Sequence, residues 1–451
     1  MWKYASILIG IILLSSHVQA QNSLSVGQVN RETYALYQKQ QWKQLVLLAK
    51  KAIAHDIDFY YLRLRMGIAY YELKNYRKSA VLFKKLHEQN PDDNSLKEYL
   101  YFSYLLGGRN MDAVRIQKKL PGSIIEKYRI RKLKFISGVY AETKYEFLDD
   151  YAIDSDLVQQ QTVRNELYHY SFGVNHKLGN RLALYHAYSW VDVKNTVVSE
   201  GISFDEEVIQ NQYYLKSHFQ LAYGTRLALA AHWVQTEVSG YSHTEQLPNA
   251  VVQGPWVKGN GPGEFNNSVQ DIKTYTYGVT QNGFIGYLGI DQDLSKWKMH
   301  AGLLYSDIDN LHRWQQELTI YYYPKGNVKL YLWAGICNQM EEKGKGDWLN
   351  RNYWDCGAGF QFAKNSWVQV GYNVGDMYKQ VENEGYSVFN GVNPVKNRIK
   401  VSCCQYLFKG KVSLFLLYQN QEEKNIYIEN NNTNSQYINV QSITGGIKWN
   451  F

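Results

Sequence analysis

The spacing of apolar residues changes once along the chain. Between residues 27 and 133 they recur every three to four positions, which predicts amphipathic helices. From Phe135 to the end they alternate with polar residues, which predicts strands. Fourteen strands are expected, with twelve to sixteen as the acceptable range. They cover 135–147, 164–177, 181–193, 209–221, 225–238, 271–290, 297–308, 313–323, 327–341, 352–363, 366–380, 396–408, 411–425 and 438–451.

The last expected strand, Ile438–Phe451, shows the alternation clearly. Its apolar face carries Ile443, Ile447, Trp449 and Phe451, and its other face is polar. A soluble sandwich has little reason to repeat this pattern to the last residue. A membrane barrel has one, because its outer face meets lipid, its inner face meets water and closure removes the sheet edges.

Individual strands predict which side chains face lipid and which face the lumen. In 366–380 the valines and Tyr372 are expected outside, with Gln369, Gly371 and Asn373 inside. In 164–177 the aromatic residues are expected outside, with His169 and Ser171 inside. An inner face this polar indicates a wet interior or a polar plug rather than a dry core. Elsewhere the expected lumen-lining residues are Lys216, His218, Arg226, His232, Arg398, Lys400 and Lys448.

The connections between the expected strands alternate between short and long. This is typical of barrels with short inner turns and longer outer loops, and it puts both ends of the barrel on the short-turn side. The longest connection, 239–270, is rich in glycine and proline, which indicates irregular chain. Two alternatives remain for it: a constriction folded into the barrel mouth, or a surface loop.

The aromatic content supports a membrane location. Aromatic residues make up 15% of the chain, with 39 tyrosines and 12 tryptophans. Tyrosine and tryptophan suit both borders of a bilayer, where the ring packs inward and the polar atom stays hydrated. The alternative is a tyrosine-rich soluble β protein.

The first twenty residues, Met1–Ala20, have the pattern of a secretory signal. Lys3 supplies the positive charge, Ile7–Leu14 forms the apolar segment, and Ala20 ends a small-residue cleavage site. This segment is too short to span a bilayer, and no interior run is long enough for a spanning helix.

The net charge of +8 is unevenly distributed. Residues 21–134 hold the basic surplus, while residues 135–451 are slightly acidic. A basic helical region attracts acidic partners, such as an acidic glycan, lipid headgroups or acidic periplasmic proteins. The alternative is a solvated helical surface, and no nucleic-acid partner is expected.

One helical stretch, Phe59–Pro91, has a recognisable arrangement of packing residues. It resembles a tetratricopeptide repeat in Gly67, Ala69, Tyr70, Tyr76, Ala80, Phe83 and Pro91, and departs from it at Arg63 and Ser79. Weaker echoes lie one repeat upstream and downstream, so a solenoid of about three helix pairs is expected. The alternative is a generic helical bundle. The resemblance implies a binding groove lined by Tyr61, Leu64, Ile68, Tyr71 and Glu72.

The sequence carries few signals of catalysis or metal binding. No nucleophile elbow, phosphate loop, HExxH or paired CxxC motif occurs. The cysteines lack metal-ligand spacing, and Cys337 and Cys356 fall on opposite faces of their strands, so free thiols are expected. We therefore expect no catalytic residues, no cofactor and no metal. An enzyme assembled from separated Ser, His and acidic residues is a further alternative.

Together, these features predict an α+β multidomain chain: a signal segment (1–20), a periplasmic helical domain (21–134) and an outer-membrane β-barrel (135–451). The terminal strand resembles the closing strand of Gram-negative outer-membrane barrels in Ile443, Ile447, Trp449 and Phe451. In that family the barrel-insertion machinery reads this strand, so the resemblance implies that Trp449 and Phe451 are the insertion signal. The domain order is similar to exopolysaccharide-secretion porins and to the YaiO-type family. That similarity implies export or passage of polysaccharide or solute. The alternatives are a non-conducting anchor for a periplasmic scaffold and a lipid-modifying enzyme.

Overall fold

The computed structural model describes residues 24–148, 158–199, 202–244, 272–308, 311–344, 346–388 and 391–451. The chain divides into two compact units, Met1–Ile124 and Ile125–Phe451. The expected signal segment and most of the 239–270 connection lie outside the described residues. Among the described residues, no helix is long and apolar enough to cross a membrane.

The first unit is built from helix pairs with a constant spacing. The first helices of the pairs begin at Val26, Tyr60 and Asn94, 34 residues apart each time, and the second helices follow the same interval. The helices are α2 (Val26–Gln38), α3 (Trp42–Ala54), α4 (Tyr60–Glu72), α5 (Tyr76–Gln89), α6 (Asn94–Leu106) and α7 (Asn110–Gln117), and the short α8 (Gly122–Lys127) spans the boundary between the units.

Small residues let these helices approach closely. A side chain at Gly67 of α4 would come within 3.2 Å of the Phe83 ring on α5. Ser79, which departs from the repeat pattern, donates a hydrogen bond of 3.0 Å from Oγ to the Gly67 carbonyl oxygen. The buried hydroxyl group therefore has a partner across the helix pair, as buried polar groups require.

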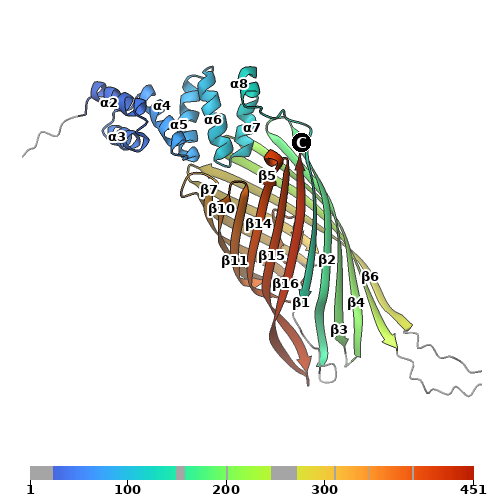
Figure 1. Ribbon diagram of the computed structural model, residues 1–451. Coiled ribbons are helices and arrows are strands. Elements are labelled where there is room, and N and C mark those ends of the chain that lie inside the picture. The colour runs from blue at the N-terminus through green and yellow to red at the C-terminus, as the bar shows by residue number, and fades with distance from the viewer. Residues whose placement is uncertain are drawn as a thin grey trace, which may run out of the picture. The chain divides into compact units, whose positions relative to one another are not determined.

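The second unit is a closed antiparallel barrel of fourteen strands, which confirms the expected number (Figure 1). The terminal strand pairs with the first, from Gly138 opposite Asn450 to Leu148 opposite Val440, so the sheet has no open edge there. The wall strands are β1 (Ile136–Leu148), β2 (Val158–Leu178), β3 (Leu182–Ser199), β4 (Ile202–Ala222), β5 (Thr225–Thr244), β6 (Ile272–Leu294), β7 (Trp297–Ile308), β8 (Leu311–Tyr322), β9 (Leu330–Gly344), β10 (Asp347–Ala363), β11 (Ser366–Met377), β14 (Val395–Leu407), β15 (Val412–Glu429) and β16 (Asn432–Asn450).

The wall is apolar outside and polar inside. On β2, Tyr170 and Phe172 are 45% and 56% exposed, whereas Ser171 between them is 6% exposed. The closing strand also has an apolar outer face, on which Ile443, Ile447, Trp449 and Phe451 are exposed. This is the architecture of a transmembrane barrel of the outer-membrane type, and it rules out a soluble sandwich with a dry centre.

Several strands are longer than the sequence pattern predicted. β4 begins at Ile202 rather than near residue 209, and β5 extends to Thr244 rather than residue 238. Their far ends carry charged or amide side chains outside, such as Gln235 and Glu237 beyond the exposed Trp233. A strand segment that projects past the bilayer has water on its outer face. The apolar alternation used to find strands is therefore lost there.

The cysteines are free thiols, as expected. Cys337 on β9 is buried inside the wall, and Cys356 on β10 is exposed on the outer face. The two side chains point to opposite sides of the sheet, and no bridge can join them without moving the backbone.

A charge placed on the outer face near the middle of the apolar band should destabilise the barrel. Leu229 on β5 lies there and is 47% exposed. We expect Leu229→Arg to lower the free energy of unfolding by about 2–4 kcal/mol, because the guanidinium would enter hydrocarbon. Denaturant titration in lipid vesicles measures this. Gln235→Arg, on the same face beyond the apolar band, is the control, and equal losses in both variants would contradict the membrane placement.

Candidate functional site

A short hairpin enters the barrel lumen from the connection between β11 and β14. Its two strands are β12 (Val381–Glu382) and β13 (Ser387–Val388), paired antiparallel. The turn between them uses the left-handed conformation at Asn383, Glu384 and Gly385, with φ of 57°, 60° and 89°. Glycine and asparagine tolerate this conformation, and Glu384 adopts it as the turn reverses. We call residues 380–388 the lumen hairpin.

The location of this hairpin corrects one sequence interpretation. The strand bounds given above leave 381–395 as one of the long connections, which the alternation in length predicts to be outer loops, and they leave 239–270 as the candidate for a constriction. Among the described residues, the segment that enters the lumen is the former. Its polar groups meet partners on the wall, whereas residues 245–271 lie outside the described part of the chain.

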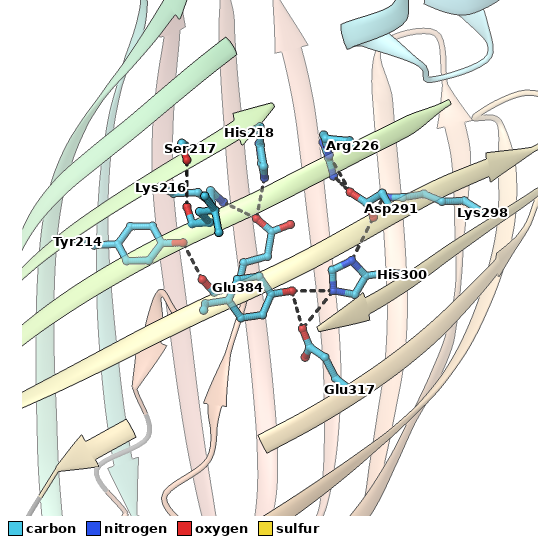
Figure 2. A network of polar contacts seen from close by, with 12 residues as sticks. Tyr214, Lys216, Ser217, His218, Arg226, Asp291, Lys298, His300, Glu317 and Glu384 are labelled. Carbon is cyan, nitrogen blue, oxygen red and sulfur yellow. Dashed lines mark hydrogen bonds and ion pairs between the residues drawn. The ribbon is translucent and has the colours of Figure 1, made fainter. Parts of the chain in front are cut away.

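Glu384 at the hairpin turn meets a cluster of side chains on β4 (Figure 2). Its carboxylate lies 3.0 Å from Lys216 Nζ and 2.8 Å from His218 Nε2. The Tyr214 hydroxyl donates to the Glu384 carbonyl oxygen at 2.8 Å. Three alternate residues of one strand therefore hold both the carboxylate and the backbone of a single hairpin residue.

Glu382 reaches cations on another strand, β14. Its carboxylate forms an ion pair with the fully buried Arg398 and lies 4.0 Å from Lys400 Nζ. Lys400 also lies 3.6 Å from Asp355 on β10. In the barrel order, β14 and β4 are separated by several strands in both directions. The two hairpin carboxylates therefore connect distant parts of the wall.

Further contacts fix the hairpin along its length. His232 Nδ1 lies 2.9 Å from the Gly385 carbonyl oxygen. Gln315 both donates to the Val381 carbonyl, at 2.6 Å, and accepts from the Val381 amide, at 3.2 Å. The Tyr386 hydroxyl lies 2.8 Å from a Glu142 carboxylate oxygen. Wall side chains make these contacts, whereas the wall strands are held to one another by backbone hydrogen bonds. The hairpin could therefore lose its contacts without breaking the strand pairing of the wall.

A second charged cluster lies on the wall beside Glu384 (Figure 2). Asp291 on β6 is 3% exposed; Arg226 Nε donates to it at 2.7 Å, and Lys298 Nζ lies 3.0 Å away. His300 connects the two acids of this cluster, with Nδ1 3.0 Å from Asp291 and Nε2 3.1 Å from Glu317.

One group of side chains in the described residues has the spacing of metal ligands: Asp291, His300 and Glu384, with ligand atoms within 4.8 Å of one another. Its two carboxylates already contact Arg226, Lys298 and Lys216. A divalent cation would enter a cluster whose negative charge is already balanced by these cations. The donor set does not fit a metal site.

Two cavities flank the hairpin. One has a volume of about 380 Å³ and is lined by wall residues that include Lys216, His300 and Asp355. The other measures about 530 Å³ and includes the aromatic residues Trp333 and Phe415. Glu382, Asn383 and Lys400 line both. The hairpin tip therefore lies between two spaces in the lumen.

No protein-family model matches the sequence, and no curated protein matches it. Among solved structures, a FadL homologue of Pseudomonas aeruginosa is 10% identical, covering 70% of this chain and 90% of that one, with a TM-score of 0.42. The Pseudomonas putida toluene transporter TodX is 9% identical with the same coverage and TM-score. OmpT, an outer membrane protein of Vibrio cholerae, is 10% identical, covering 69% and 96%, at 0.32. These likenesses are weak, so the fold assignment rests on the strand pairing of this chain.

The structure brings most of the expected lumen residues to the hairpin. Lys216, His218, His232, Arg398 and Lys400 contact it directly. Arg226 belongs to the Asp291 cluster, and Lys448 lies on the inner face of β16, close enough to Lys177 and Lys216 for their charges to interact.

The expected groove on α4 contains exposed and packed residues. Tyr61 and Glu72 are exposed and Leu64 is half-buried, whereas Ile68 is 9% exposed. Tyr71 packs edge-on against Tyr76 and Tyr99. Ile68 and Tyr71 thus contribute to packing between helices, and Tyr61 and Glu72 form the accessible part of this set.

Sequence reasoning missed the acidic side of the site, namely Glu382, Glu384 and Asp291. A local signal did exist for the hairpin: Val381-Glu382 and Ser387-Val388 flank a turn that contains Asn383 and Gly385. Two short apolar–polar segments around such a turn are a hairpin pattern. That pattern does not show that the hairpin lies in the lumen.

Proposed function

We propose that this protein is an outer-membrane barrel through which small polar solutes pass, and that the lumen hairpin controls their passage. The observation that carries this proposal is the docking of a charged hairpin inside a polar lumen, through contacts separate from the wall's strand pairing. Releasing the hairpin costs ion pairs and hydrogen bonds and leaves the barrel closed edge to edge. A barrel used only as an anchor has no need for such a separable element.

The size of the cavities favours small solutes over a continuous polymer. The two spaces measure about 380 and 530 Å³, and the hairpin tip lies between them. An extended polysaccharide would require the hairpin to leave the lumen. Polysaccharide export is a more specific form of this proposal, and it requires the hairpin to leave the lumen.

Vesicle measurements test the passage of solutes. The full chain, reconstituted in vesicles, should admit small sugars and amino acids at rates above those of protein-free vesicles, with a steep decline as solute size increases. Swelling rates against solute mass give this cutoff. Rates equal to those of protein-free vesicles for every solute would contradict passage and favour an anchoring role.

The helical unit supports a second candidate function, a periplasmic adaptor. The 34-residue interval between its helix pairs is the length of a tetratricopeptide repeat, which favours a solenoid of that kind. On this proposal the unit lies in the periplasm and binds periplasmic proteins or acidic glycan through Tyr61, Glu72 and its basic surface. The barrel-insertion machinery, reading Trp449 and Phe451, is a proposed partner during assembly.

A further inference from the structure

We propose that the lumen cations around the hairpin form a binding site for an acidic solute with two negative groups, such as a dicarboxylate, and that Glu382 and Glu384 occupy this site in its absence. The inference rests on the proposed passage of solutes and names the class of solute. It assigns the hairpin the role of an internal competitor.

The balance of charge around the smaller cavity supports this assignment. Five cationic wall side chains lie in it or pair with its lining: Lys216, Arg226, Lys298, Arg398 and Lys400. Three wall carboxylates accompany them: Asp291, Glu317 and Asp355. Lysines, arginines and carboxylates alone therefore leave the wall with an excess of two positive charges, to which His300, held between Asp291 and Glu317, adds when protonated. The hairpin supplies two carboxylates, Glu382 and Glu384, which offset this positive charge.

The geometry also suits a ligand with two separated acidic groups. Lys216 on β4 and Lys400 on β14 come from distant parts of the wall, yet both line the same cavity. Each contacts one hairpin carboxylate, at 3.0 and 4.0 Å. An ammonium or guanidinium group that binds a protein carboxylate also binds a solute carboxylate, because the contacting atoms are the same.

The approach to the site carries additional positive charge. Lys177 and Lys448 lie on the inner faces of β2 and β16 and form no ion pair with any other residue that the structure describes. The charge of Lys448 is close enough to interact with those of Lys177 and Lys216. Unbalanced positive charge in a lumen raises the local concentration of anions.

Calorimetric titration of the detergent-solubilised full chain with adipate tests the inference. Because Glu382→Gln with Glu384→Gln removes the competing carboxylates, this double variant should bind adipate at least tenfold more tightly than the unmodified chain. Lys216→Gln with Lys400→Gln should weaken binding at least tenfold. Lys325→Gln, in the β8–β9 turn and outside the lining of both cavities, should change it less than threefold. The uncharged analogue 1,6-hexanediol should give no binding.

Equal adipate affinity in all variants, or binding of hexanediol as tightly as adipate, would overturn the proposal. If the lysine variant does not fold, a salt titration of the glutamine variant decides the question, since binding that is unchanged from low to high salt also overturns it. Calorimetry measures adipate binding whether or not the solute passes through the barrel. Adipate binding in a chain that fails the vesicle test leaves this inference standing, and passage of sugars without adipate binding removes only this inference.

Discussion

Replacing residues 380–388 with a short Gly-Ser turn should convert the barrel into an open pore. The hairpin lies between the two lumen cavities, and the remaining wall would still close edge to edge. Barrels of eight strands are filled by their side chains, whereas those of sixteen to eighteen leave an aqueous channel, so fourteen strands without a plug should leave a passage. We expect single-channel conductance in planar bilayers to rise at least tenfold over that of the unmodified chain.

A matched control separates opening from general damage. Inserting the same Gly-Ser residues at Gly346, in the β9–β10 turn, lengthens a connection outside the hairpin contacts and should leave the conductance unchanged. If the hairpin replacement and the Gly346 insertion had equal conductance, the hairpin would not be the element that restricts the lumen.

Arg398→Met should cause a large loss of stability. Arg398 is 0% exposed, and its ion pair with Glu382 joins the wall to the hairpin. Removing one partner of a buried pair leaves a carboxylate short of a cation, which costs about 3–5 kcal/mol of unfolding free energy. Denaturant titration of the reconstituted barrel measures this loss. Adding Glu382→Leu should restore much of the stability, because no charge is then left without its partner.

The same strand provides the control for this prediction. Lys396 lies 3.6 Å from Asp376, with the two side chains 35% and 36% exposed. Lys396→Met should cost less than about 1 kcal/mol, because water already solvates both groups. A loss in Arg398→Met no larger than in Lys396→Met would show that the hairpin pair contributes little, and the hairpin would then be held by its other contacts.

The barrel wall was largely predictable from the sequence. Alternation is a local property, because neighbouring side chains of a strand point to opposite faces regardless of the rest of the fold. The number of strands, the free thiols and the outer position of residues such as Tyr170 and Ile443 follow from it. The strand ends that project beyond the bilayer could not be predicted from alternation, because the outer face meets water there and need not carry apolar side chains.

The arrangement of the lumen depended on the tertiary structure. The sequence identifies Lys216 and Arg398 as polar residues on apolar-patterned strands. It does not show that their carboxylate partners, Glu384 and Glu382, lie on one hairpin that follows β11. That pairing requires β4 and β14 to face the same enclosed space, and only closure of the barrel brings them there. Periodicity along the chain determined the wall and its two faces, whereas contacts between segments far apart in sequence decided what occupies the interior.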